Sequence, residues 1–253
     1  MPHEVTPKER SWLLQEKYAG IETPEFENDL LRLAEGVPLA YVIGHVPFLS
    51  ASIDLSHKPL IPRVETEHWV AEAIANLRTH DKVPKTILDL FSGSGCIGVA
   101  FAQAFPDASV HFAEYDAALI PEIEENVRRN MLSPTHTKVF QSDVFSNVPD
   151  RYDVITANPP YIPESRKSAL DASVTDFEPH EALFGGEDGL AFIRPLITET
   201  PKFLNPGGSL FVEFDSAQKD VIKDLAHTSG AWRETRFIRD QYDEWRAVEL
   251  VRN

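Results

Sequence analysis

The sequence predicts an α/β protein with a seven-stranded, mostly parallel sheet and a small helical region at its N-terminal end. From residue 86 onward, short apolar runs typical of strands alternate with stretches of helical periodicity. This alternation is typical of a parallel sheet covered by helices on both faces. Only a short connection separates the last two apolar runs, so these two strands are expected to pair antiparallel.

The N-terminal part predicts two short helices and a linker. Thr6-Pro7 and Thr23-Pro24 each place a capping hydroxyl before a proline suited to the first helical position, and Gly36 ends the second helix. Residues 46–55 predict a short extended or hairpin element. We therefore expect a helical region over residues 1–40, a linker over 41–64 and a larger domain over 65–253.

The larger domain begins with an amphipathic helix predicted over residues 65–77. Residues 162–188 lack regular periodicity, and an irregular segment of this length indicates a functional loop. Strands are expected at 86–90, 109–114, 138–141, 152–157, 208–214, 232–238 and 247–251, with helices at 96–104, 119–130, 189–204 and 217–229.

The composition limits the partners and the compartment. The 253 residues carry a formal net charge of −16 without a basic cluster, which argues against a stable nucleic-acid complex. No apolar run approaches the ~20 residues of a membrane helix, and the N-terminus lacks a secretory signal. Cys96 is the single cysteine, which favours a reducing intracellular compartment, and the histidines show no metal-ligand spacing.

A glycine-rich loop is expected between the strand at 86–90 and the helix at 96–104. Residues 93–98, GSGCIG, match the dinucleotide-binding pattern G-x-G-x-x-G. Glu114 ends the next strand, 21 residues after Gly93, where a ribose-binding acid belongs. Taken alone, these features leave an NAD enzyme as one interpretation.

Acidic residues at successive strand ends favour a different ligand. Asp89, just before the glycines, would repel a pyrophosphate but suits a ligand with a cationic end, such as S-adenosylmethionine. Glu114 can accept hydrogen bonds from both ribose hydroxyls, and Asp143 from the adenine amino group. The carboxyl edge of an open α/β sheet is where such ligands bind.

The fourth predicted strand ends in Asn158-Pro159-Pro160-Tyr161 on the same edge. The Asn158 side chain and the Pro159 carbonyl offer hydrogen-bond acceptors, the prolines limit movement, and Tyr161 supplies a flat wall. Together they can hold a planar NH2 group with its lone pair aimed at a methyl group. We expect Asn158, Pro159 and Tyr161 to be the catalytic residues.

Five segments in this order resemble the HemK/PrmC family of S-adenosylmethionine-dependent methyltransferases. This family modifies the glutamine of the Gly-Gly-Gln motif in class I peptide chain release factors. The Asn-Pro-Pro-Tyr motif alone is shared with adenine-amine methyltransferases, but the ordered set is more specific and spans about residues 30–250. The segments are GVPLAYVIGHVPF (36–48), LIPRVETE (60–67), NPPYI (158–162), FEPHEALFGGEDGL (177–190) and LNPGGSLFVEFDSAQ (204–218).

The resemblance implies a Rossmann-like class I methyltransferase fold and a release factor as the protein substrate. It implies a glutamine site at Asn158, Pro159, Pro160 and Tyr161. Arg63 and Glu65 either line the substrate entrance or form an ion pair at a helix start. We expect a monomer of the cytoplasm or mitochondrial matrix, with residues 1–40 docking the substrate. The implied cofactor site consists of Phe91, Ser92, Gly93, Ser94, Gly95, Glu114, Asp143, Val144 and Asn158, to which the strand-end argument adds Asp89.

The chain also departs from the family pattern. Phe91 stands where many relatives have glycine, Glu114 replaces the more usual aspartate, and Val144 stands where some relatives have an aromatic. The N-terminal helical region is shorter than the family's five-helix domain. We interpret these differences as marks of a divergent member, of eukaryotic organellar type.

Two other functions remain open at this point. An adenine-amine methyltransferase acting on DNA or RNA would use the same amine chemistry, but it should carry a basic groove or an added target-recognition region. A non-enzymatic module with the same fold is the other alternative, and the complete set of Asp89, Glu114, Asp143 and Asn158 argues against it.

Overall fold

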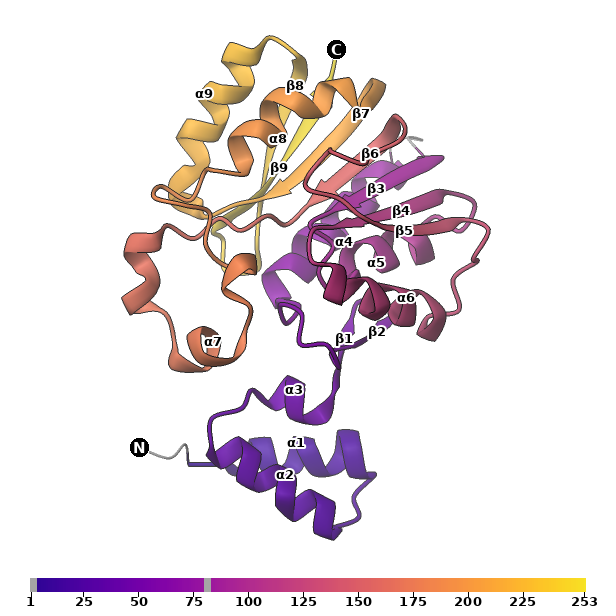
Figure 1. The fold of residues 1–253 in the computed structure, drawn as a ribbon. Coiled ribbons are helices and arrows are strands. Elements are labelled where there is room, and N and C mark those ends of the chain that lie inside the picture. The colour runs from indigo at the N-terminus through magenta and orange to yellow at the C-terminus, as the bar shows by residue number, and fades with distance from the viewer. Residues whose placement is uncertain (1–3, 80–82) are drawn as a thin grey trace.

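The computed structural model describes residues 4–79 and 83–253. A small helical region lies below a larger α/β domain in Figure 1, and residues 1–3 of the predicted region 1–40 lie outside the described residues. Over the described ranges, no helix is long and apolar enough to cross a membrane.

The helical region contains α1 (Pro7–Tyr18), α2 (Pro24–Ala34) and α3 (Leu39–Ile43). Both predicted helix starts are confirmed, and the Thr6 hydroxyl accepts a hydrogen bond from the Glu9 amide at 3.2 Å. Helix α3 was not predicted, because five residues are too few to show helical periodicity. The region has a small core of its own, formed by Leu13, Phe26, Leu33 and Val42.

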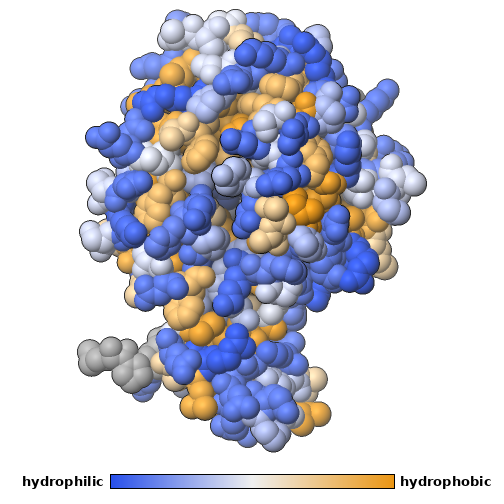
Figure 2. All heavy atoms as spheres, viewed as in Figure 1, coloured by the Kyte–Doolittle hydropathy of each residue, from blue (hydrophilic) through white to orange (hydrophobic). Residues whose placement is uncertain are grey.

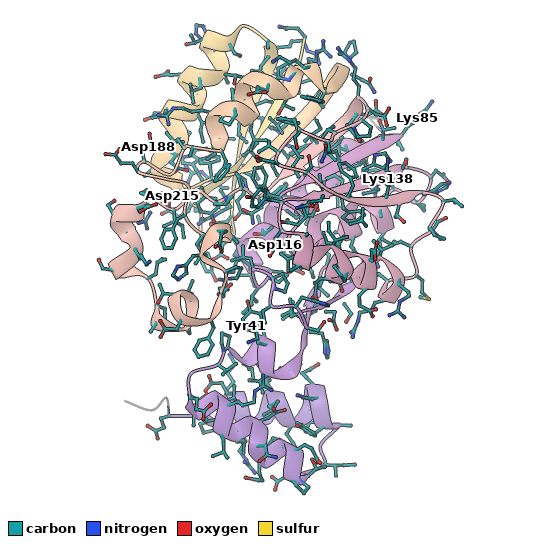
Figure 3. All side chains as sticks on the ribbon, viewed as in Figure 1. Tyr41, Lys85, Asp116, Lys138, Asp188 and Asp215 are labelled. Carbon is teal, nitrogen blue, oxygen red and sulfur yellow. The ribbon has the colours of Figure 1, made fainter. Side chains whose placement is uncertain are left out.

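The predicted hairpin consists of β1 (His45–Phe48) and β2 (Ala51–Asp54), which pair antiparallel. The side chain of Asn126 accepts a hydrogen bond from the Asp54 amide at 2.7 Å and donates to the Asp54 carbonyl at 3.2 Å. The Tyr41 hydroxyl donates to the Pro59 carbonyl at 2.7 Å, and Tyr41 lies where the helical region meets the larger domain (Figure 3). The linker is therefore fastened at both ends.

The larger domain contains a seven-stranded sheet of order β5-β4-β3-β6-β7-β9-β8, in which β9 runs antiparallel to both of its neighbours. This confirms the predicted fold and the antiparallel pairing of the last two strands. The strands are β3 (Thr86–Leu90), β4 (Ser109–Glu114), β5 (Thr137–Gln141), β6 (Tyr152–Ala157), β7 (Leu204–Glu213), β8 (Trp232–Arg239) and β9 (Trp245–Arg252).

Helices cover both faces of the sheet, so the central strands are buried almost continuously, and successive side chains point to opposite faces. Ile87 belongs to one apolar cluster, with residues of α4, α5 and α6, while Leu88 belongs to the other, with residues of α8 and α9. The helices are α4 (Val64–Thr79), α5 (Cys96–Ala104), α6 (Ile120–Arg129), α7 (Ala172–Phe177), α8 (Ile193–Glu199) and α9 (Lys219–Ser229), with short 3₁₀ turns η1 (Ala117–Leu119), η2 (Glu164–Ala169), η3 (His180–Ala182), η4 (Thr200–Lys202) and η5 (Ser216–Gln218).

Two predicted boundaries were wrong. The helix expected over 189–204 is limited to α8 and the turn η4, since Gly189 has a φ of +74° and closes a loop. The segment 162–188, expected to be irregular, contains η2, α7 and η3. Its two ends are drawn together by a parallel bridge between Ile162 and Phe184.

Candidate active site

The carboxyl ends of four neighbouring strands meet at one edge of the sheet. Leu90 pairs with Ala113 on one side and with Ala157 on the other, and Glu114 pairs with Gln141. The residues that follow these strands therefore lie beside one another. This edge brings together the glycine loop, Glu114, the Asp143 turn and the Asn-Pro-Pro-Tyr loop.

The glycine loop, residues 91–95, follows β3 and leads into α5. Phe91 has a φ of +54°, in the left-handed region that glycine adopts without steric cost. The phenyl ring of Phe91 meets that of Phe192 edge-on, with ring centroids 5.5 Å apart. A phenylalanine thus keeps the glycine-like backbone of this position, and its ring gains a packing partner.

Glu114 is held against this loop. One carboxylate oxygen accepts from the Gly93 amide and the other from the Asp116 amide, each at 2.8 Å. Asp116 lies near the centre of the view in Figure 3. The side chain is largely buried, and this burial raises the pKa of Glu114. Because a carboxylate oxygen has two lone pairs, each oxygen can still accept a hydrogen bond from a ligand.

Asp89 lies under the loop and is only 1% exposed. The two oxygens of its carboxylate accept from the Thr156 hydroxyl at 2.9 Å and from the Gly98 amide at 3.0 Å. Asp89 therefore ties together β3, β6 and the first turn of α5. These contacts assign it a structural role, while a direct role toward a cofactor stays a prediction.

Burial raises the pKa of Asp89 to about 7, above the value of about 3.9 for an unfolded chain. The folded state therefore binds this proton more tightly than the unfolded state does. The resulting stabilisation is complete below the unfolded pKa and is lost as the pH rises through the folded pKa.

The free energy of unfolding should thus fall between about pH 4 and about pH 7 in the wild type relative to Asp89→Asn, which cannot titrate there. Urea unfolding of both proteins across this range measures the difference. A difference that stays constant with pH would contradict the buried, titrating carboxylate.

The turn after β5 contributes Asp143 and Val144. The Asp143 carboxylate is exposed and has no hydrogen-bond partner in the part of the chain that the structure describes. Val144 has a φ of +47°, which is unusual for a β-branched residue, and the Ser142 hydroxyl holds its carbonyl at 2.9 Å. The backbone of this turn is therefore fixed while its carboxylate remains available.

The Asn-Pro-Pro-Tyr loop follows β6. Within residues 4–79 and 83–253, neither the Asn158 amide group nor the Pro159 carbonyl has a hydrogen-bond partner. Tyr161 is fixed at both ends, because its hydroxyl donates to Glu213 at 3.0 Å and its carbonyl accepts from Gln218 at 2.9 Å. The loop is thus held rigidly while two of its acceptors stay free.

Arg63 and Glu65 do not pair with each other. The Arg63 guanidinium instead binds the carboxylate of Glu178 at 2.5 Å, and the other oxygen of Glu178 accepts from the Ile61 amide at 3.1 Å. Glu178 directly follows α7, so this buried carboxylate joins the 162–188 segment to the loop before α4. The alternative of an ion pair between Arg63 and Glu65 is therefore wrong. A role of these two residues at the substrate entrance remains a proposal.

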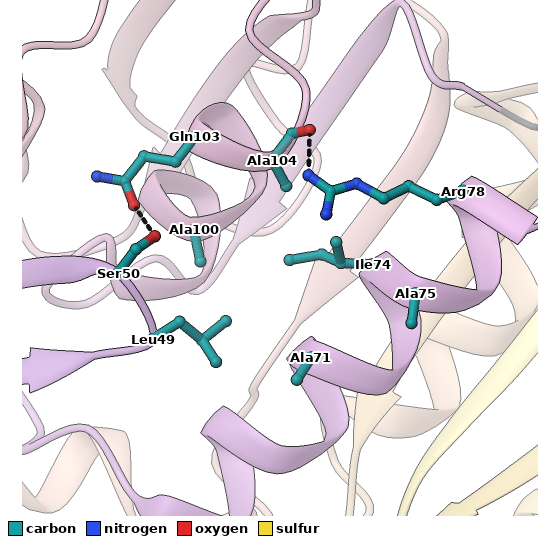
Figure 4. Close-up of a pocket in the computed structure, with 9 residues that line it drawn as sticks. All are labelled: Leu49, Ser50, Ala71, Ile74, Ala75, Arg78, Ala100, Gln103 and Ala104. Carbon is teal, nitrogen blue, oxygen red and sulfur yellow. Dashed lines mark hydrogen bonds between the residues drawn. The ribbon is translucent and has the colours of Figure 1, made fainter.

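A groove of about 290 Å³ lies elsewhere, between α4, α5 and the tip of the β1–β2 hairpin (Figure 4). It is lined by small side chains such as Ala71, Ala75 and Ala100. Helix α5 starts at the glycine loop, whereas the groove reaches Ala104 at the other end of this helix. The groove is thus separate from the candidate active site.

In the described ranges, no group of three or more His, Cys, Asp or Glu side chains could hold a metal ion.

Comparison with known proteins identifies the family. A family model for the methyltransferase small domain matches residues 73–175. The release factor glutamine methyltransferase of Rhodopirellula baltica is 37% identical over 219 residues, covering 85% of this chain and 74% of the relative. The release factor glutamine methyltransferase of Streptococcus pneumoniae is 32% identical, and the match covers 93% of this chain and 82% of the relative. The chain belongs to the release factor glutamine methyltransferase family. The resemblance seen in the sequence is confirmed.

Solved structures of other methyltransferases share the fold of this chain. A methyltransferase from Pyrococcus furiosus superposes with a TM-score of 0.58 at 19% identity, covering 89% of this chain and 98% of that one. The hMettl16 catalytic domain, solved in complex with a 3'UTR hairpin, superposes with a TM-score of 0.63 at 16% identity. The match covers 79% of this chain and 75% of that domain's chain. Identities this low establish the shared fold alone.

Two further residues lie near this edge of the sheet and are not among the site residues predicted from the sequence. Tyr115 directly follows Glu114 and is 62% exposed, so its ring is available to a ligand at the same edge. An aromatic residue directly after a strand-end acid was a signal that could have been read. Glu213 could not be found in this way, because its link to Tyr161 joins positions 52 residues apart.

Proposed function

We propose that this chain transfers a methyl group from S-adenosylmethionine to the side-chain amide nitrogen of the glutamine in the Gly-Gly-Gln motif of a class I release factor. Family membership supports the activity. The single structural observation that supports the chemistry is the pair of unpartnered acceptors, Asn158 and Pro159, on a rigid loop beside the glycine loop.

The residues at the sheet edge suit the methyl donor. Glu114 can bind the ribose hydroxyls, Asp143 the adenine amino group and Tyr115 the adenine face, and the acidic edge suits a cationic ligand. When bound, S-adenosylmethionine supplies an electrophilic methyl group on a cationic sulfur. A 16S rRNA methyltransferase from T. Thermophilus with this fold was solved with AdoMet, at a TM-score of 0.57 and 18% identity, with 83% of this chain and 50% of that one covered.

Asn158 and Pro159 orient the target amide. If the Asn158 side-chain oxygen and the Pro159 carbonyl each accept one hydrogen of the amide NH2, the plane of that group is fixed. The nitrogen lone pair, perpendicular to this plane, then faces the glycine loop, and Tyr161 covers the other side. As the nitrogen gains the methyl group it becomes strongly acidic and loses one proton to solvent, so no strong base is required.

Transfer of tritium from [methyl-³H]S-adenosylmethionine separates this function from the adenine alternative. A purified release factor should be labelled, whereas its variant with glutamate in place of the motif glutamine should not. Duplex DNA and RNA should remain unlabelled, consistent with the net charge of −16. Labelling of nucleic acid in preference to the release factor would replace the proposal with its alternative.

We also propose that residues 1–40 dock the body of the release factor, with residues 41–64 as the linker and 65–253 as the methyltransferase domain. The helical region has its own core and stands apart from the candidate active site (Figure 1). Figure 2 shows a face on which hydrophilic residues alternate with hydrophobic patches, some of them where this region joins the larger domain. Trp12 and Leu31, on α1 and α2, leave 51% and 64% of their surfaces exposed.

Replacing both Trp12 and Leu31 by alanine should raise the KM for an intact release factor about 30-fold, because a truncated aromatic anchor typically costs about 2 kcal/mol. The KM for a short Gly-Gly-Gln peptide should stay unchanged. Met131→Ala, at a side chain 90% exposed on the larger domain, is the matched control. An unchanged KM for the intact protein would remove the docking role.

The proposed setting is a monomer in a reducing compartment, the cytoplasm or the mitochondrial matrix. Cys96 is buried, and burial raises the pKa of its thiol to about 12, which disfavours the reactive thiolate.

A further inference from the structure

Glu213, the last residue of β7, is a buried carboxylate next to the candidate active site. It is 1% exposed, and the residue before it, Val212, pairs with Ala157, which directly precedes Asn158. One oxygen of Glu213 accepts from the Tyr161 hydroxyl at 3.0 Å. Because Tyr161 is only partly buried, its hydroxyl is anchored inside while part of the residue remains accessible.

The other oxygen of Glu213 binds the start of α4. It accepts from the Thr66 hydroxyl at 2.7 Å and from the Trp69 indole nitrogen at 2.6 Å, and both side chains are buried. Helix α4 begins directly after Arg63, which binds Glu178 in the 162–188 segment. Glu213 therefore connects the Asn-Pro-Pro-Tyr loop to the element that follows the proposed substrate entrance.

A buried carboxylate at this position is costly for stability alone. Removing a carboxylate from water costs several kcal/mol in order of magnitude, and well-packed apolar side chains often stabilise such a site equally well. The three hydrogen bonds fix the direction of the carboxylate, and the Arg246 guanidinium, paired with Asp240 at 3.0 Å, supplies a nearby positive charge. This arrangement suits a group that has to hold a ring in one orientation.

We propose that Glu213 is the positioning residue that sets the orientation of the Tyr161 ring, and through it the plane of the target amide. The inference rests on the proposed function, which places the amide against Tyr161. Glu213 does not touch the reacting atoms in this scheme. It acts through the Tyr161 hydroxyl and couples that ring to the start of α4.

Glu213→Gln tests this role with little change in volume. If the glutamine oxygen faces Thr66 and Trp69, the new NH2 group faces the Tyr161 hydroxyl, which must then accept instead of donate. We expect kcat for the release factor to fall between about 10-fold and 100-fold, since small misplacements near a reacting group have effects of this size. The affinity for S-adenosylmethionine should stay unchanged.

A double-mutant cycle with Tyr161→Phe shows whether Glu213 acts through the hydroxyl. The double variant should be no slower than the slower single variant, because both remove the same contact. Losses in kcat that multiply would instead assign Glu213 a general structural role and overturn the proposal. Glu249→Gln is the matched control, because Glu249 is equally buried, accepts from Ser209, Asn76 and Arg236, and has no contact with Tyr161.

A readout that needs no turnover keeps this inference separate from the proposed function. The chain has six tyrosines, so ring-labelled ¹³C tyrosine gives a simple spectrum in which Tyr161→Phe assigns the Tyr161 signal. Glu213→Gln should shift that signal and Glu249→Gln should not. A signal unmoved by Glu213→Gln overturns the proposal. A shifted signal in a protein whose wild type never methylates a release factor supports the positioning and refutes the proposed function.

Discussion

Replacing Asn158 by alanine should slow methyl transfer by about 10²–10³-fold, the usual loss for one preorganised hydrogen-bond partner at a reacting group. The Asn158 side chain has no partner among the described residues, so it is free to accept from the target amide, and its removal disturbs no internal hydrogen bond. Most of the affinity for S-adenosylmethionine should remain. Single-turnover methylation and calorimetric titration on the same variant separate the two quantities.

Asn158→Asp is the sharper probe of the same role. Aspartate keeps the acceptor, and its negative charge should bind the cationic methyl donor as tightly as the wild type or more tightly. That charge also stabilises the donor before transfer, and the reaction then neutralises the cation. We therefore expect slow transfer despite good binding. Transfer at the wild-type rate would refute the idea that a neutral amide grips the glutamine.

Glu114→Ala should weaken S-adenosylmethionine binding by tens-fold or more. A carboxylate that accepts from two ribose hydroxyls makes two charge-assisted hydrogen bonds, each worth about 1.5–3 kcal/mol. Glu114→Gln, which keeps the shape without the charge, should lose less. Isothermal calorimetry measures both variants.

The Glu114 result needs one control, because Glu114 also accepts from the Gly93 amide and so supports the glycine loop. Asp116→Ala keeps the backbone hydrogen bond to Glu114 and removes the cap of the turn η1, where Asp116 accepts from the Ala118 amide at 2.9 Å, together with one negative charge near Glu114. We expect this variant to bind normally. Unchanged affinity in Glu114→Ala would place the ribose elsewhere.

The fold could be predicted because its signals are local. Short apolar runs in strands, proline and threonine at helix starts, and glycine at helix ends each act within a few residues, and the helix predicted over 96–104 has the bounds of α5. Because the carboxyl ends of parallel strands meet at one edge, the strand ends in the sequence predict the loop, Glu114 and Asn158 at a common edge. Helix α3 and the short turns of 162–188 lacked such periodicity.

The partners of the site residues could not be predicted, because they depend on contacts between distant parts of the chain. Arg63 meets Glu178 across 115 positions, and Asp89 meets Thr156 across 67. A sequence pattern shows that an acid lies at a strand end, but it does not show whether the carboxylate faces a ligand or the interior. Asp89 turned inward, whereas Asp143 stays exposed.

Tandem mass spectrometry of a class I release factor after incubation with this protein and S-adenosylmethionine is the most direct test of the central claim. We predict a mass increase of one methylene per release factor, located on the side-chain amide of the Gly-Gly-Gln glutamine and formed about 10²–10³-fold more slowly when Asn158→Ala replaces the wild type. An unmodified release factor after incubation with folded protein that binds S-adenosylmethionine, or a methyl group on any other residue, would contradict the account.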